Sequence, residues 1–221
     1  MATIKYWGHA CFLITTADGV RILVDPYEPG GFNGAFKYQP ITDEADVVLV
    51  THEHADHNSV QGLVGHPLVL RANAVVEGVS FVTVAARHDD GGGQDRGEIR
   101  IFTWEADGVR FCHVGDLGHL LTEPQLALLG PVDVLFVPTG GFFTIDQATA
   151  RQVGAQLHAR VTIPMHYLTP RLQFPPQYQL APVEDFLAGQ TNVLRVGGPT
   201  WQVSGETLPA EPLIVVLDAV E

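Results

Sequence analysis

The sequence predicts an α/β protein in which two mixed β-sheets face each other and helices cover the outside. Three observations support this fold class. Strand-like segments dominate the first half of the chain, strand–helix units appear in the second half, and two Asp-Gly pairs separate apolar runs in the manner of β-hairpins. A chain of 221 residues can bury a sizeable core, and we expect residues 1–221 to form a single domain.

The N-terminal part of the chain predicts two strands, over Thr3–Thr15 and Val20–Val24. Asp18-Gly19 lies between them and indicates a hairpin. Asp25-Pro26 then ends the second strand. Glu28–Pro40 is rich in glycine, proline and aromatic residues, and we expect it to be a surface loop.

A short, continuous apolar run over Asp46–Val50 is typical of a strand that is buried on both faces. Asp107-Gly108 indicates a second hairpin. The remaining predicted strands are Leu68–Leu70, Val79–Ala85, Ile99–Glu105, Val109–Val114, Val132–Val137 and Val161–Pro164.

Two helices are predicted in the second half of the chain. The first covers Glu123–Leu129, where Pro124 suits the first turn. The second covers Asp146–His158, and Thr144 with Gln147 three residues later has the spacing of a capping box.

The charge and composition exclude several classes of protein. The net charge of −13 and the presence of only two lysines disfavour a nucleic-acid partner, because such a surface repels phosphate backbones. The N-terminus lacks the pattern of a signal peptide, and no apolar run is long enough to span a membrane. Cys11 and Cys112 are too few for a disulfide framework and favour a reducing, cytoplasmic location.

The residues that indicate chemistry begin directly after the predicted strand Asp46–Val50. His52, His54, Asp56 and His57 are four potential metal ligands within the run Thr51–His57. In an extended segment the first three share one face, so His57 joins them only if the chain turns after His54. Imidazole and carboxylate together suit zinc, iron or manganese.

This run, Thr-His-x-His-x-Asp-His after an apolar strand, resembles the signature of the metallo-β-lactamase superfamily. The resemblance implies an αβ/βα four-layer sandwich and three further ligands in a fixed order. The chain offers these at the predicted strand ends, as His88, Asp116 and His166. The segments Gly8–Leu13 and Pro138–Gly141 resemble one branch of the superfamily, the ascorbate-phosphate lactonase-like proteins, which are related to N-acyl-phosphatidylethanolamine phospholipase D. The similarity covers roughly residues 3–170.

The resemblance also implies a mechanism with two divalent metal ions, zinc first, with manganese or iron as alternatives. A hydroxide shared by the two ions would cleave an ester, lactone, amide or phosphoester bond in a small molecule. The first ion would be held by His52, His54 and His88, the second by Asp56, His57 and His166, and Asp116 would bridge them. The expected catalytic residues are Asp56, which would also orient the attacking water, and His9 and His113, for which we expect supporting or proton-transfer roles.

Other functions are weighed against this hydrolase. A nuclease of the same superfamily would need a basic groove or an added RNA-binding arm, which this acidic chain lacks. A diiron oxygen-reducing protein tends to carry Glu where this chain has His54, and it is usually fused to a flavin domain. A metal-stabilised binding protein without activity is the alternative from another class. The branch includes homo-oligomers, which makes self-association an expectation as well.

The substrate class depends on the cations near the expected site. Arg87 and Arg171 are the two that the sequence places close to ligands, and Arg171 is the better candidate for a phosphate clamp because Arg87 should point away from the metals. Asp89 and Asp90 follow His88 directly and would disfavour an anionic substrate. We therefore expect a neutral ester, lactone or amide rather than a phosphate-bearing substrate.

Overall fold

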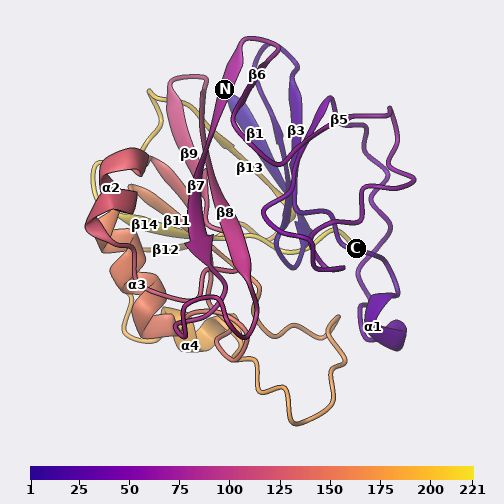
Figure 1. Ribbon diagram of the computed structural model, residues 1–221. Coiled ribbons are helices and arrows are strands. Elements are labelled where there is room, and N and C mark those ends of the chain that lie inside the picture. The colour runs from indigo at the N-terminus through magenta and orange to yellow at the C-terminus, as the bar shows by residue number, and fades with distance from the viewer.

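The computed structural model describes residues 1–221, and its strands form two mixed sheets that face each other (Figure 1). The six-stranded sheet has the order β13-β1-β2-β3-β4-β5. Its strands are β1 (Ala2–Gly8), β2 (Cys11–Thr15), β3 (Arg21–Val24), β4 (Val47–Leu49), β5 (Leu68–Leu70) and β13 (Thr200–Val203). The eight-stranded sheet has the order β12-β14-β11-β10-β9-β8-β7-β6. Its strands are β6 (Ala74–Val76), β7 (Val79–Arg87), β8 (Glu98–Ala106), β9 (Val109–His113), β10 (Val134–Pro138), β11 (Val161–Met165), β12 (Val193–Arg195) and β14 (Leu213–Val216).

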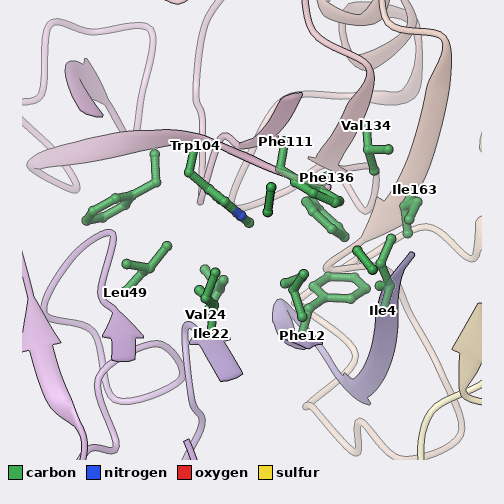
Figure 2. Close-up of a cluster of buried hydrophobic side chains, with 14 of the residues drawn as sticks. Ile4, Phe12, Ile22, Val24, Leu49, Trp104, Phe111, Val134, Phe136 and Ile163 are labelled. Atoms are coloured by element: carbon green, nitrogen blue, oxygen red, sulfur yellow. The ribbon is translucent and has the colours of Figure 1, made fainter. Parts of the chain in front are cut away.

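The main core lies between the two sheets. Alternate residues of β1 face it, because successive side chains of a strand point to opposite sides. Figure 2 shows side chains of the six-stranded sheet, such as Phe12 and Val24, facing Trp104 and Phe136 of the eight-stranded sheet. The predicted fold class, two facing mixed sheets, is confirmed.

Three helices cover the outer face of the eight-stranded sheet: α2 (Glu123–Leu129), α3 (Gln147–Gln156) and α4 (Val183–Leu187) (Figure 1). The predicted bounds of α2 are confirmed. The predicted capping box before α3 is wrong, because the carboxylate of Asp146 accepts the Thr149 N–H at 2.7 Å and is the N-cap itself.

Loops rather than helices cover the outer face of the six-stranded sheet. The short α1 (Gly31–Gly34) contains left-handed residues and is only a turn. Around it Tyr27, Phe36 and Tyr38 are buried against that face, together with apolar residues of the segment after β11. Glu28–Pro40 is a loop at the surface, as predicted, and most of its residues are exposed. The rings of Phe36 and Tyr38 within it are nevertheless buried, because the packed sheet provides a place for them that the local sequence does not indicate.

The hairpins depend on local turns, of which two were predicted and one was missed. Asp18-Gly19 and Asp107-Gly108 connect antiparallel pairs, as predicted. The predicted strand Thr3–Thr15 is instead broken into β1 and β2 at Gly8 and His9, which have φ of +124° and +55°. A side chain at Gly8 would collide with the ring of Tyr38.

The sequence also left the C-terminal strands and α4 unassigned. These elements add β12 and β14 to one sheet and β13 to the other. None of the helices is long and apolar enough to cross a membrane.

Candidate metal centre

The directions of the strands gather the predicted ligands at one end of the molecule. β3 and β4 are parallel, as are β9, β10 and β11. β7 runs in the same direction as β9, since both are antiparallel to β8. The residues that follow β4, β7, β9 and β11 therefore meet at the same edge, which is the lower end in Figure 1.

His52, His54 and His88 form the first group, with one ring nitrogen from each lying within 4.8 Å of the others. His52 follows β4 and His88 follows β7. Nε2 of His52 lies 3.0 Å from Nδ1 of His54. His54 is exposed and the other two are buried, so this group opens to solvent on one side.

The second group also has its potential ligand atoms within 4.8 Å of one another, and it consists of Asp56, His57, His166 and His9. The chain turns after His54, whose carbonyl accepts the His57 N–H at 2.9 Å, and this turn directs His57 inward. Nε2 of His9 lies 3.0 Å from Oδ2 of Asp56. His9 reaches this point because the unpredicted turn between β1 and β2 carries it.

Asp116 lies between the two groups. Its Oδ2 is 3.2 Å from Nε2 of His88 in the first group and 3.2 Å from Nε2 of His166 in the second. Its Oδ1 is 3.2 Å from Nε2 of His57. Gly115, with a φ of +55°, turns the chain after β9 so that the carboxylate points inward. The arrangement is what a bridging carboxylate requires.

Asp25 and Thr51 hold the imidazoles in fixed orientations. Asp25 is fully buried and accepts three hydrogen bonds, two from Thr51 (2.8 and 2.7 Å) and one from Nδ1 of His57 (2.9 Å). The Thr51 hydroxyl in turn accepts from Nδ1 of His52 at 3.0 Å. Both rings thus keep an Nε2 lone pair for a cation, which is how buried carboxylates and hydroxyls orient metal-binding histidines.

His113 lies behind this layer and is fully buried. Its Nε2 donates to the Ala10 carbonyl at 3.0 Å, its Nδ1 accepts the Gly115 N–H at 3.2 Å, and Nδ1 is 3.8 Å from Asp25 Oδ2. Burial lowers the pKa of His113, so the ring is neutral. These contacts suit a positioning role, and a direct role in proton transfer stays a prediction.

Two buried atoms without a hydrogen-bond partner indicate whether these residues fit a metal ion. Nε2 of His57 and Oδ1 of Asp116 face each other and have no hydrogen-bond partner. Burial would lower the pKa of His57, but the carboxylates around it, Asp116 foremost, raise that pKa well above its ordinary value. A proton on the ring is one way to balance these carboxylates, and a divalent cation is the other. Because the donors are nitrogens and oxygens without a thiolate, they fit zinc, manganese or iron.

A cavity of about 520 Å³ opens over the two groups of candidate ligands. Its floor includes His54, Asp56, His88, Asp116 and His166, and its wall includes the aromatic rings of Phe32, Phe143, Phe174 and Tyr178. Neighbouring rings of this wall lie 5.4 to 6.1 Å apart, centre to centre. We call it the aromatic cavity.

A second, polar hollow of about 320 Å³ lies on the other side of His54. Arg71, Arg96 and Arg100 line it, and Arg96 lines the aromatic cavity as well. Neither Arg87 nor Arg171 lines either space, and Nη1 of Arg171 donates instead to the Lys37 carbonyl at 3.5 Å. Arg171, the candidate phosphate clamp of the sequence analysis, therefore lies outside the site, and the structure brings Arg96 there instead.

The chain is similar to known proteins over most of its length. Residues 3–166 match the beta-lactamase superfamily domain. A UPF0173 metal-dependent hydrolase of Thermococcus onnurineus is 32% identical over 197 residues, which cover 76% of this chain and 86% of that protein. A UPF0173 metal-dependent hydrolase of Thermococcus kodakarensis is 30% identical over 210 residues, or 81% of this chain and 91% of that one.

Among solved structures, a candidate Zn-dependent hydrolase of the metallo-beta-lactamase superfamily from Thermotoga maritima superposes with a TM-score of 0.80 at 33% identity, covering 100% of both chains. An isothiocyanate hydrolase from Delia radicum gut bacteria shares the fold at a TM-score of 0.59 and 14% identity, over 84% of this chain and 92% of that one.

Proposed function

Since the chain belongs to the UPF0173 metal-dependent hydrolases of the metallo-beta-lactamase superfamily, we propose that it cleaves a neutral ester, lactone or amide bond in a small molecule. The observation that carries the proposal is the convergence of imidazole and carboxylate ligands on the floor of the aromatic cavity. A cavity with apolar walls and a few convergent polar groups is typical of a small-molecule site.

In this proposal two divalent ions occupy the floor, with zinc as the first choice. His52, His54 and His88 would hold one ion, Asp56, His57 and His166 would hold the other, and Asp116, which lies between the two groups, would serve both. Nε2 of His9 also points into the second group, but in this proposal His9 is not a ligand and donates a hydrogen bond to Asp56 instead. When bound, such ions polarise a carbonyl oxygen and lower the pKa of water.

Asp56 is the residue that we assign to proton transfer. Burial lowers the pKa of His9 to about 4, so this ring is neutral near pH 7 and donates its Nε2 proton to Asp56. Although burial would raise the pKa of Asp56, the charge of His57 and the hydrogen bond from His9 hold it below its ordinary value. An ionised Asp56 that lines the cavity suits the acceptor of a proton from the attacking water, and it then returns that proton to the leaving group.

The charges around the cavity favour a carbonyl compound over a phosphoester. Arg96 is the only lysine or arginine that lines it, whereas Asp56 and Asp116 both do. Two divalent ions would offset the charge of these carboxylates, so the argument depends on the single nearby cation and on the net charge of −13, which a phosphoester would make more negative. A lactonase-like activity follows from this preference and from the branch that the motifs resemble.

The test combines metal analysis with a substrate panel. Protein purified without chelator is analysed for its elements and then assayed with 4-nitrophenyl hexanoate, γ-nonalactone, hexananilide and bis(4-nitrophenyl) phosphate. We expect two metal ions per chain, turnover of at least one carbonyl compound above that of the phosphodiester, loss of turnover with a chelator and recovery with added metal. Faster hydrolysis of the phosphodiester than of every carbonyl compound would contradict the proposed bond class.

A further inference from the structure

The loop between β7 and β8 is folded around Asp89. This buried carboxylate accepts the backbone N–H groups of Gly93 (2.8 Å), Asp95 (3.2 Å) and Arg96 (2.9 Å). These bonds, that of Arg96 first, lower the pKa of Asp89. The carboxylate that the sequence placed beside the substrate is therefore turned into its own loop, where it fixes the backbone at Arg96.

The side chain of Arg96 is held in place but keeps its charge available. Its Nη1 donates to the carbonyl of Phe143 at 3.0 Å, and its Cζ lies 5.5 Å from the centre of the Phe143 ring. No carboxylate lies within ion-pair distance of this guanidinium, whereas Arg71, its neighbour in the polar hollow, is paired with Glu53 at 2.5 Å. This contact uses one N–H of the guanidinium, and its other N–H groups remain available to bind a ligand.

The location of Arg96 connects it to the substrate. Arg96 and His54 are the two residues that line both the aromatic cavity and the polar hollow. A molecule lying over the metal-binding groups with an apolar part against Phe143 and Phe174 would bring a second substituent toward Arg96. The most suitable substituent is a carboxylate, because a guanidinium fork matches its two oxygens and a single cation balances its single charge.

We propose that Arg96 is a specificity-determining residue that binds a carboxylate on the substrate, at a distance from the bond that is cleaved. The inference rests on the proposed function for the cleaved bond, which remains a neutral ester, lactone or amide. The substrate is then a carboxylic acid that carries both an apolar group and a hydrolysable carbonyl bond.

The first test compares substrates that differ only in this charge. Mono-4-nitrophenyl adipate and suberate are assayed beside the same esters with a terminal amide in place of the carboxylate. The wild type should show the lower KM for the acids. Arg96→Gln, which keeps an N–H for the Phe143 carbonyl, should raise the KM of the acids by about 10- to 100-fold and change that of the amides by less than about 3-fold. Arg96→Lys should recover part of the loss, and Arg171→Gln, the matched control, should change neither.

A purely structural role for Arg96 would raise the KM of acids and amides alike, and that result would overturn the inference. Equal KM values for acids and amides in the wild type, at both chain lengths, would do the same.

The second test measures binding without any reaction. Calorimetric titration with 5-phenoxypentanoate and 5-phenoxypentanamide, which contain no ester bond, should give a tighter Kd for the acid in the wild type and equal values in Arg96→Gln. This result can hold even if no ester is hydrolysed, so it separates the failure of the inference from the failure of the proposed function. Phenyl phosphate is titrated in parallel, and a larger dependence of its Kd on Arg96 than that of the acid would contradict the choice of carboxylate.

Discussion

Replacing Asp116 with asparagine removes one negative charge from the point where the two ligand groups meet and leaves the shape of the side chain nearly unchanged. The carboxylate is 2% exposed and lies 3.2 Å from the Nε2 atoms of His57, His88 and His166. An amide cannot bridge two cations as a carboxylate does, because only one of its two terminal atoms carries a usable lone pair. The variant should therefore bind metal more weakly and hydrolyse more slowly.

The size of the effect follows from the charge that is lost. Two unit charges about 4 Å apart interact by about 4 kcal/mol at the effective dielectric constant of about 20 that describes protein sites. Since each 1.4 kcal/mol is a factor of ten, the affinity for the more weakly held ion should fall on the order of 10³-fold. We expect the variant to keep at most one ion per chain after dialysis and to lose activity by a similar factor.

The assay titrates metal-free wild type and Asp116→Asn with Zn²⁺ in competition with a chromophoric chelator and measures kcat/KM on the best substrate of the panel. Far-UV circular dichroism checks that the variant is folded. Asp90→Asn is the matched control, because Asp90 is an exposed carboxylate only two residues beyond His88. Its metal affinity and rate should equal those of the wild type.

Wild-type stoichiometry and rate in a folded Asp116→Asn protein would refute the reasoning, since the carboxylate would then not contact the ions. Equal losses in Asp116→Asn and Asp90→Asn would refute it too, because the effect would reflect the general field of the acidic chain rather than a bridging ligand.

Three further predictions concern the residues around the ligands. Asp25→Asn should weaken Zn²⁺ binding by about 10- to 100-fold in the same titration, because it removes the charge that orients the imidazole of His57, and an unchanged Kd would contradict this role. The metal-free protein should be most stable near pH 6.5 in denaturant titrations. The pKa of His9 is lowered from 6.5 to about 4, so the fold loses stability as the pH falls below 6.5. The pKa of His57 is raised, so the fold loses the stabilisation from the His57 proton as the pH rises above 6.5 toward the raised pKa. A steady rise in stability from pH 5 to 8 would be incompatible with these two shifts. Gly115→Ala should cost about 1–3 kcal/mol in the free energy of unfolding, since the residue has a φ of +55° and a Cβ would lie 2.8 Å from the Thr51 hydroxyl, and a stability equal to the wild type would show that the turn relaxes.

The sequence by itself predicted the elements whose signals are local. Apolar runs, period-two alternation and Asp-Gly pairs depend on neighbouring residues, and they located most of the strands up to β11 and both longer helices. The set of candidate ligands was predictable because its main motif is contiguous and each remaining candidate follows a recognisable strand. The structure brings all seven of these side chains together.

Other features were decided only by contacts between distant segments. The short strands and the helix after β11 have weak local patterns and form because they pair with or pack on sheets that already exist. The burial of Tyr38 and the turn at His9 depend on each other, since the ring occupies the space that a side chain at Gly8 would need. Neither could be recognised from its own neighbours in the chain.

Arg96, the cation that lines the aromatic cavity, shows most clearly the difference between what the sequence predicts and what only tertiary contacts decide. Sequence proximity to His166 made Arg171 the candidate clamp, but proximity along a chain says little about direction in space once a loop leaves the strand. Arg96 reaches the aromatic cavity because Asp89 folds the loop beneath it and Phe143, from a segment after β10, receives its N–H. The sequence determined which residue types could bind metal and roughly where the strands end. The tertiary structure decided which charges face the aromatic cavity, because that depends on the closure of loops by hydrogen bonds and packing between residues far apart in the chain.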